Sequence, residues 1–393
     1  MAFGDDQAVM ERRGFLRAAG GAGLLALGGC ATARPVPVPV SAAAPHPLPF
    51  YDRLPHLAPI RPHPDRIFNI TVCSRPFRAA GPRLDAETIG GKLVVHNYGH
   101  GGSGWSLSWG SGVVAVRKAL AGGARDIAVI GCGALGLTAA LVAQRAGAKV
   151  TIYARDRLSE TRSARATGTW SPDSRIALAE GAGPDFPALW EEMARTSWRM
   201  HSAFLGAPGA PVEWYDRYFL SDYTQEEQAA RRAAAPPYAG PHFAQYQGRV
   251  PDLGPRNQTL PPGSHPFPLP RVSRTSLMMF NITEYGRVLE ADFRLAGGTI
   301  VTRTFASPAE FVALKEPVVI NCTGYGARAL MKDESVIPVR GQIAWLIPQP
   351  DVNYGLQYRN VSLLGRRDGI VIQQVGADES WGYNIPDETP DRA

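Results

Sequence analysis

A short glycine-rich loop is the clearest chemical signature in this sequence. Residues 126–130 (DIAVI) form a β-branched apolar run, and a GxGxxG spacing follows directly at residues 131–136 (GCGALG). Such glycines permit a tight turn and let the backbone approach a pyrophosphate, whose charge is stabilised by the amides of a following helix. Residues 137–146 have the pattern of that helix, and residues 149–154 that of the next strand. The predicted dinucleotide-binding residues are Gly131, Gly133, Ala134, Leu135 and Gly136.

The end of the second strand leaves the ribose contact open. A carboxylate usually ends this strand and bonds the adenosine ribose. Here Arg155 fills that position and Asp156 follows it. Either Asp156 takes the ribose role or Arg155 lies over the ribose. Arg155 could also accommodate a 2′-phosphate, as in NADP, or be a solvated arginine at a strand end.

A second unusual segment, residues 95–110 (VHNYGHGGSGWSLSWG), lies ahead of the loop. It combines glycines and aromatics with two histidines, His96 and His100. The glycines between the histidines oppose a helix, and neither a third ligand nor a glutamate partner motif is present. The spacing therefore predicts no metal site.

Residues 95–110 closely resemble the FAD-binding signature of D-amino-acid oxidases and D-aspartate oxidases. Residues 75–87 (RPFRAAGPRLDAE) resemble the RPxRP…RLE segment of that family. Further family marks follow in the family's order: residues 275–277 leading into Tyr285, residues 321–324 (NCTG) and residues 340–343 (RGQI). The resemblance extends from about residue 66 to the low 380s.

The resemblance implies an α/β protein with a Rossmann-like FAD-binding domain and a mixed β-sheet substrate domain. In typical members the segment matching residues 95–110 comes last, whereas here it precedes the loop at Gly131. This order looks like a circular permutation. It is physically plausible because a helix expected after Trp109 ends near residues 121–123 (AGG) and leads straight into the strand at residue 126.

FAD is the cofactor that the resemblance implies. Residues 161–172 resemble the segment that passes the pyrophosphate and the flavin ring in the family. Residues near the start of the helix after His100 would place their amides towards the flavin, where negative charge develops. The residues implied by these two segments are Thr161, Arg162, Ser163, Gly168 and Thr169, together with Gly101, Gly102, Ser103, Gly104, Trp105 and Ser106.

The resemblance also implies a catalytic set of Arg83, Tyr358 and Gly102. Arg83 matches the family arginine that clamps the substrate carboxylate through two parallel charge-assisted bonds. Arg75 and Arg78 are interpreted as surface or structural charges.

A departure from the family affects the substrate side of the pocket. Tyr358 keeps one tyrosine of a family YxxxY pair, and Ser362 replaces the other. Ordinary D-amino-acid specificity is therefore in doubt. Arg359, Arg366 or Arg367 could favour an acidic side chain, unless they are solvated loop charges.

The implied activity is oxidation of D-amino acids to 2-oxo acids, with ammonia and hydrogen peroxide as further products. Hydride would pass from the substrate α-carbon to flavin N5, and no catalytic base is predicted because the cofactor supplies the difficult chemistry. Oxygen or a membrane electron acceptor would be the partner. Two alternatives stay open: an exported amine or amino-acid dehydrogenase, and a non-catalytic flavin-binding lipoprotein.

Composition narrows the class of protein. The chain has 393 residues, of which 45% are hydrophobic and 19% charged, as in folded globular proteins. Its net charge of +6 is not matched by a basic helix, a zinc-finger spacing or a Lys/Arg run among aromatics, so we predict no nucleic-acid partner. Cys73, Cys132 and Cys322 form no evident disulfide framework.

The N-terminal residues resemble an export address. Arg12-Arg13 resembles a twin-arginine pattern, residues 18–29 are weakly apolar, and residues 27–30 (LGGC) resemble a lipoprotein cleavage box that would lipidate Cys30. A periplasmic or membrane-anchored lipoprotein is therefore expected. We expect this order of parts: an export signal (1–29), an Ala/Pro-rich tether (30–64), the FAD-binding domain (65–172), the substrate domain (173–272), a return segment of the FAD-binding domain (273–336) and a second part of the substrate domain (337–393).

Overall fold

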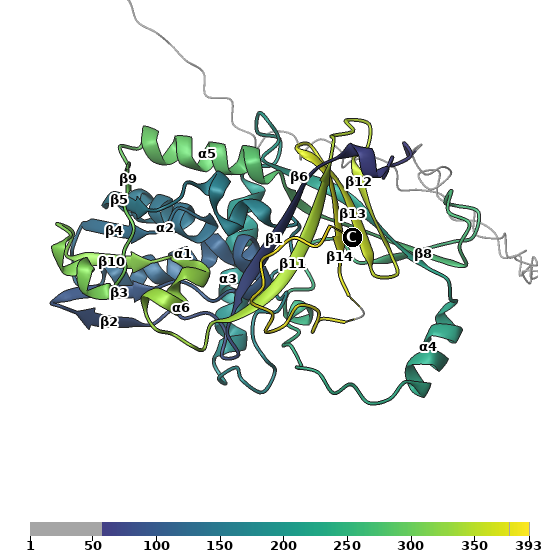
Figure 1. Cartoon of the computed structure of the whole chain (residues 1–393), viewed down its shortest axis with the longest axis horizontal. Helices are drawn as coiled ribbons and strands as arrows, with labels where there is room; N and C mark the ends of the chain where they lie inside the picture. Colours follow the sequence, from purple (N-terminus) through teal and green to yellow (C-terminus); the bar gives the residue numbers. More distant parts are fainter. Residues whose placement is uncertain (1–56, 377, 393) are drawn as a thin grey trace, which may run out of the picture. The chain divides into compact units, whose positions relative to one another are not determined.

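The computed structural model describes residues 57–376 and 378–392. The expected export signal, Cys30 and the first part of the tether lie outside these residues. Two β-sheets, one of six strands and one of eight, organise the described part of the chain (Figure 1). No helix of this part is long and apolar enough to cross a membrane.

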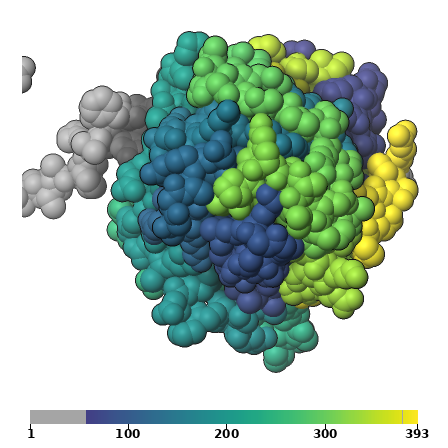
Figure 2. Space-filling view, turned by 90° about the vertical axis from the view of Figure 1, so that its left-hand side faces the viewer, coloured from purple at the N-terminus to yellow at the C-terminus, as the bar shows by residue number. Residues whose placement is uncertain are grey.

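The six-stranded sheet has the order β2-β3-β10-β4-β5-β9. Neighbouring strands from β3 to β9 run parallel, and β2 adds an antiparallel edge. Figure 2 shows one face of the molecule, where segments near residues 90 and 320 lie together because β3 pairs with β10. The strands are β2 (Ala86–Ile89), β3 (Lys92–His96), β4 (Asp126–Ile130), β5 (Lys149–Ala154), β9 (Thr299–Thr302) and β10 (Val318–Asn321).

Helices pack around this sheet and confirm the predicted βαβ unit, in which α2 joins β4 to β5. α1 packs against both α2 and α3, and two glycines make this close approach possible. A Cβ at Gly110 would lie 2.2 Å from the Met193 carbonyl oxygen of α3, and one at Gly112 would lie 3.3 Å from Ala139 of α2. The helices are α1 (Gly104–Leu120), α2 (Ala134–Arg145), α3 (Phe186–Ser202), α4 (Gln225–Ala234), α5 (Ile282–Leu295) and α6 (Ala327–Leu330).

The eight-stranded sheet has the order β1-β11-β14-β13-β12-β6-β8-β7 and is mostly antiparallel. Two of its strands differ from the expected division, because β1 and β8 fall in ranges predicted for the FAD-binding domain. Both nevertheless pair within this sheet, β1 with β11 and β8 with β6. The strands are β1 (Ile67–Phe77), β6 (Val212–Ser221), β7 (Gln258–Leu260), β8 (Arg271–Phe280), β11 (Ile337–Leu346), β12 (Tyr354–Tyr358), β13 (Val361–Arg366) and β14 (Gly369–Gln374).

A buried hydrogen-bond chain joins α1, α3 and α5. Trp109 Nε1 donates to Tyr285 Oη at 2.8 Å, and Tyr285 Oη lies 2.8 Å from His201 Nδ1. His201 Nε2 lies 3.1 Å from the Trp105 carbonyl oxygen. Because that carbonyl can only accept, Nε2 carries the proton and Nδ1 accepts from the tyrosine hydroxyl. All four residues are almost fully buried, so each polar group depends on its partner.

Removing the central hydroxyl should destabilise the protein. In Tyr285→Phe, the Trp109 N–H and His201 Nδ1 lose their shared partner in a dry environment. We expect the free energy of unfolding to fall by about 1–3 kcal/mol. Urea unfolding of the flavin-loaded protein measures this, with exposed Tyr238→Phe as the control. A loss no larger than that of the control would contradict the role of this chain.

The same chain should make stability depend on pH. Burial lowers the pKa of His201 to about 3, whereas the unfolded histidine titrates near its ordinary pKa of about 6.5. As the pH falls below this value, the unfolded state binds a proton that the folded state excludes. The free energy of unfolding should therefore drop by about 2 kcal/mol between pH 7 and pH 5 through this group alone.

The check compares unfolding at pH 7 and pH 5 in the wild type and in His201→Gln. The variant should lose about 2 kcal/mol less over this interval, because Gln does not titrate. Equal losses in the two proteins would show that His201 binds a proton as readily in the folded state as in the unfolded state.

Candidate functional site

A cavity of about 910 Å³ lies at the carboxyl ends of β4, β5 and β10. Its other side is formed by residues of β1, β6, β11, β12, β13 and β14. Ligands of open α/β sheets bind at the carboxyl ends of the strands, and the volume is typical of a site for a cofactor or other small molecule. The cavity therefore joins a nucleotide-binding edge to a sheet-lined space.

The glycine loop is shaped by close backbone contacts. Gly131 has φ +106°, and a Cβ there would lie 2.6 Å from the Cys322 carbonyl oxygen. Gly131, Gly133, Ala134 and Leu135, which are predicted to bind the dinucleotide, line the cavity. Gly136 does not line it. Its Cβ would lie 2.0 Å from the Gly131 carbonyl oxygen, so this glycine lets the loop turn into α2.

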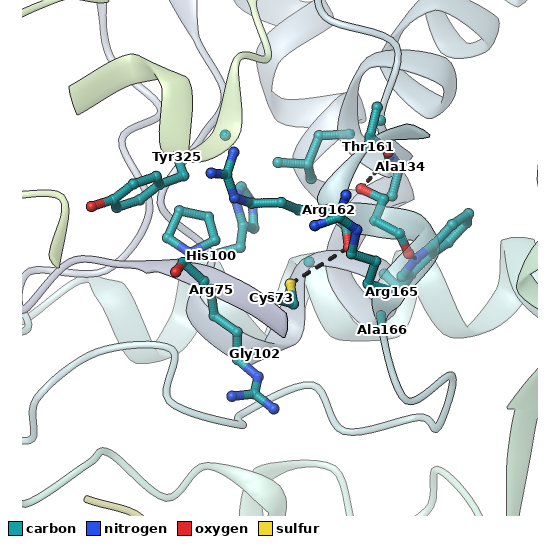
Figure 3. Close-up of a pocket in the computed structure, with 18 of the residues that line it drawn as sticks. Cys73, Arg75, His100, Gly102, Ala134, Thr161, Arg162, Arg165, Ala166 and Tyr325 are labelled. Atoms are coloured by element: carbon teal, nitrogen blue, oxygen red, sulfur yellow. Dashed lines mark hydrogen bonds between the residues drawn. The ribbon is translucent and has the colours of Figure 1, made fainter. Parts of the chain in front are cut away.

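Positive charge gathers beside the start of α2. The N-cap residue, Gly133, offers no side chain to the first turn, and Ser163 Oγ accepts from the Ala134 amide at 3.1 Å. Figure 3 shows Arg162 and Arg165 close to this end of the cavity. Arg162 pairs with Glu388 at 2.9 Å and lies over the Tyr325 ring. A helix start whose N-cap residue has no side chain, flanked by arginines, suits a pyrophosphate.

Arg155 and Asp156 both line the cavity and pair with each other at 2.7 Å. The hydrogen bond from Arg155 lowers the pKa of Asp156 below its usual value. The two residues that are alternative candidates for the contact with the ribose therefore both lie at the cavity, where they form an ion pair.

A second helix start faces the same cavity. Gly101, Gly102, Gly104, Trp105 and Ser106 line it at the N-terminus of α1. A Cβ at Gly101, where φ is +55°, would lie 1.8 Å from the Arg175 carbonyl oxygen, and one at Gly102 would lie 2.5 Å from Ser174 Oγ. These glycines let two backbone segments meet at the cavity wall.

The other predicted cofactor residues lie in the same region, with one exception. Thr161, Ser163, Gly168 and Thr169 line the cavity. Ser103 is buried behind the wall and donates to the Ser174 carbonyl oxygen at 3.1 Å. Its hydroxyl therefore makes a structural contact, and its role with the cofactor stays a prediction.

The two histidines of the signature segment have separate environments. His100 lines the cavity, and burial lowers its pKa to about 3, so its ring is neutral. His96 lies outside the cavity lining, with Nε2 2.7 Å from Glu87 and Nδ1 3.2 Å from Asn321.

The predicted carboxylate clamp, Arg83, does not reach the cavity. Its Nε donates to Asp85 at 2.9 Å, its Nη1 to Tyr98 Oη at 3.1 Å and its Nη2 to Glu87 at 3.2 Å. The guanidinium is neutralised locally and is absent from the cavity lining. The clamp prediction for Arg83 is therefore wrong.

Arg75, interpreted from the sequence as a surface or structural charge, lines the cavity instead. Its Nη1 donates to the carbonyl oxygens of Val339 and Arg340 at 3.4 and 3.3 Å, and it makes no ion pair with a described residue. Gly341 leaves room for it, because a Cβ there would lie 2.6 Å from the guanidinium nitrogens. Figure 3 shows its side chain reaching away from Arg162. Arg75 is thus a cation of the cavity wall, without an ion pair among the described residues, whose place the sequence analysis missed.

Tyr358 also lies away from the cavity, and its hydroxyl donates to Asp222 at 2.7 Å. Its neighbour Gln357 lines the cavity, because successive residues of a strand face opposite sides of the sheet. Ser362 lines the cavity beside Gln357, its register partner. Arg217 of β6, which the sequence analysis did not single out, donates to both.

These features define a site for an anionic dinucleotide beside a further space lined by cationic side chains. Glycine-shaped backbone, two helix starts and several arginines fit FAD, whose pyrophosphate needs amides and positive charge. Residues 126–393 match the family model described as FAD dependent oxidoreductase, and the chain belongs to this family. The comparison confirms the predicted fold class and the predicted cofactor, FAD.

Two relatives are D-amino-acid oxidases. The one from Streptomyces coelicolor is 29% identical over 234 residues, which are 58% of this chain and 61% of the relative. The one from Rubrobacter xylanophilus is 29% identical over 220 residues, which are 55% of this chain and 57% of the relative. The chain thus spans about three fifths of the length of the curated relatives it matches.

The fold is also similar to solved structures. Glycine oxidase from Geobacillus kaustophilus is 12% identical, with a TM-score of 0.44 over 63% of this chain and 70% of that chain. L-proline dehydrogenase from P. horikoshii is 15% identical, with a TM-score of 0.42 over 68% and 73%.

The glycine contacts predict a loss of FAD affinity on substitution. In Gly101→Ala the new Cβ must displace the Arg175 backbone and adopt an unfavourable positive φ. Strain of about 1–3 kcal/mol at the site would raise the Kd for FAD roughly 5- to 150-fold. Titration of the apoprotein, followed by flavin fluorescence, measures the Kd. Gly122→Ala is the control, because its Cβ meets open space away from the cavity. Unchanged affinity in Gly101→Ala would remove this residue from the site.

Proposed function

We propose that the protein oxidises D-amino acids to 2-oxo acids, releasing ammonia and passing the electrons to oxygen as hydrogen peroxide. The observation that carries this proposal is Arg75, an unpaired guanidinium in the wall of a cavity suited to FAD. Similarity to D-amino-acid oxidases supports the choice of substrate.

Arg75 has the chemistry needed to orient an amino acid. Burial lowers its pKa, yet a guanidinium stays protonated at neutral pH and can donate two parallel bonds to a carboxylate. Such a fork fixes the direction of the α-carbon as well as the charge. Bound FAD supplies the redox chemistry by accepting a hydride. The residues of this chain bind, orient and shield the substrate.

The neighbouring groups favour binding over proton transfer. His100 is neutral, and its two nitrogens have no partner among the described residues. Arg175 lies on the same wall and donates to the Glu379 carbonyl oxygen at 2.7 Å. Burial lowers its pKa to about 10, which leaves it charged near neutral pH. Two cations lie on this wall, and no carboxylate of the described residues bonds His100 to make it a base. This arrangement suits a reaction in which the substrate brings the negative charge.

We also propose that the chain order is a circular permutation of the family order. The family model begins at residue 126, whereas the signature segment at residues 95–110 precedes it. Five residues separate the end of α1 at Leu120 from the start of β4 at Asp126, so the two elements need only a short connection. Export by a twin-arginine signal, with a lipid anchor at Cys30, is part of the proposal and rests on residues outside the described part.

The decisive experiment is anaerobic flavin reduction. The chain from Ala31 onward is loaded with FAD and mixed with matched D- and L-amino acids while the absorbance near 450 nm, typical of oxidised flavin, is recorded. We expect D-amino acids to bleach this band and oxygen to restore it. A flavin that no amino acid reduces would overturn the proposed substrate class, and slow recovery in oxygen would favour a dehydrogenase.

The role of Arg75 is tested in the same assay. Arg75→Met leaves the substrate carboxylate without its partner, at a cost of about 2–5 kcal/mol. The kcat/KM for flavin reduction should fall roughly 30- to 3000-fold. Arg78→Met is the matched control, because Arg78 belongs to the same segment but bonds Ser335 and Gly81 outside the cavity lining. Equal effects in the two variants would refute the assignment.

A further inference from the structure

A continuous row of polar side chains crosses the eight-stranded sheet on its cavity side. The row follows the strand register, since Gln373 of β14 pairs with Ser362 of β13, and Ser362 pairs with Gln357 of β12. Arg217 of β6 reaches into the row from the next strand. All four residues line the cavity, and we call them the donor wall.

Each side-chain oxygen of the donor wall already accepts a hydrogen bond. Arg217 Nη2 donates to Gln357 Oε1 at 2.7 Å and to Ser362 Oγ at 3.0 Å. Thr167 Oγ1 donates to Gln373 Oε1 at 2.8 Å. The amide NH₂ groups of both glutamines and the hydroxyl hydrogen of Ser362 have no acceptor among the described residues. The wall therefore presents donors to the cavity, which suits an anion.

The charge of Arg217 has no counterion within the described part of the chain. Its Nε is buried without a partner, and its guanidinium packs over the Phe219 ring. Burial lowers its pKa to about 10, so it keeps its charge at neutral pH. A half-buried cation without an anion is costly unless a ligand supplies the negative charge.

Other arginines of this sheet region are neutralised. Arg359 pairs with Asp222 at 2.9 Å, Arg366 with Asp368 at 2.5 Å and Arg367 with Glu213 at 3.0 Å. These are the arginines to which the sequence analysis gave a possible role with acidic side chains, and the structure commits each of them to a carboxylate. Arg217 is therefore the better candidate for a second anion-binding residue.

The distance between Arg217 and Arg75 suits a substrate with two negative groups. The guanidinium of Arg75 lies against Gly341 of β11, and that of Arg217 reaches Ser362 of β13, two strands further along the sheet. Two interstrand spacings of about 4.8 Å, with an offset of two residues along the strand, give roughly 12 Å. Guanidinium–carboxylate contacts at both ends leave about 4–5 Å between the two carboxyl carbons, which the three C–C bonds of aspartate or the four of glutamate can span.

We propose that the donor wall binds a second carboxylate and makes acidic amino acids the preferred substrates. This inference rests on the proposed function, because Arg75 must hold the α-carboxylate while Arg217 holds the carboxylate of the side chain. The neutral members of the wall contribute donors and keep Arg217 in place. Arg217 is thus a specificity-determining residue.

Isosteric substrate pairs provide the kinetic test. D-glutamate is compared with D-glutamine, and D-aspartate with D-asparagine, in flavin reduction by the wild type, Arg217→Met and Gln357→Glu. We expect the wild type to favour the acids about 10²-fold in kcat/KM. Arg217→Met should abolish this preference, because it slows the acids far more than the amides. Gln357→Glu should act in the same way, because the new carboxylate would form an ion pair with the Arg217 guanidinium.

A binding measurement separates this inference from the proposed activity. Calorimetry of the flavin-loaded protein compares glutarate, a dicarboxylate, with butyrate, a monocarboxylate of similar size. Glutarate should bind at least tenfold more tightly to the wild type and lose this advantage in Arg217→Met. Arg359→Met is the matched control, because Arg359 is exposed, paired with Asp222 and outside the cavity lining.

The outcomes are distinct. If no amino acid reduces the flavin but glutarate keeps its advantage, the activity fails and the second anion site stands. If acids and amides react equally in the wild type, or glutarate binds no better than butyrate, the inference is overturned. A wild-type preference that survives in Arg217→Met would also overturn it. Retained flavin absorbance shows that each variant is folded.

Discussion

Uncompensated positive charge in one cavity is the constraint on which the arrangement of this protein depends. Seven arginines and four carboxylates line the cavity, an excess of three positive charges beside two helix N-termini. Charges held out of water repel one another and lose hydration, so such a site favours bound anions. The pyrophosphate of FAD at one end and the carboxylate of the proposed substrate at the other would supply them. Ligands that bind the folded state alone also stabilise it, so cofactor binding and folding are linked.

Glycines occur at the points of the charged cavity where a neighbouring segment of the chain lies too close for a side chain. Gly131 brings its loop against Cys322 at the nucleotide end, and Gly101 brings the start of α1 against Arg175. Gly341 serves the substrate end differently, because its missing side chain leaves space for the Arg75 guanidinium. Each of these glycines lies in a motif that the sequence analysis recognised. The structure shows why glycine is required at these positions: neighbouring atoms leave no room for a Cβ, and backbone flexibility is not the reason.

Much of the nucleotide end could be predicted because its signals are local. The strand, the glycine loop and the helix at residues 126–145 follow one another within twenty residues. The substrate end could not be predicted in the same way. Arg83 was favoured by its motif, yet Asp85 and Glu87 stand two and four residues away and neutralise it. Arg75 has no acid so near in sequence, and it lines the cavity together with its β1 neighbours Cys73, Ser74 and Pro76.

Arg217 shows which signal could have revealed the remaining part of the site. On β6 it shares a face with Tyr215 and Phe219, where an apolar residue would be expected in a strand between two others. Its register partners are Gly355 of β12 and Thr275 of β8, and neither carries a charge. The next residue, Asp216, faces the other side and meets Arg274 and Ser276 there. A sequence shows that β6 carries both charges, but only the register shows which charge has a partner. A charged residue on an aromatic strand face, with neutral cross-strand neighbours, is therefore evidence for a ligand, and recognising it requires the pairing of strands about 60 and 140 residues apart.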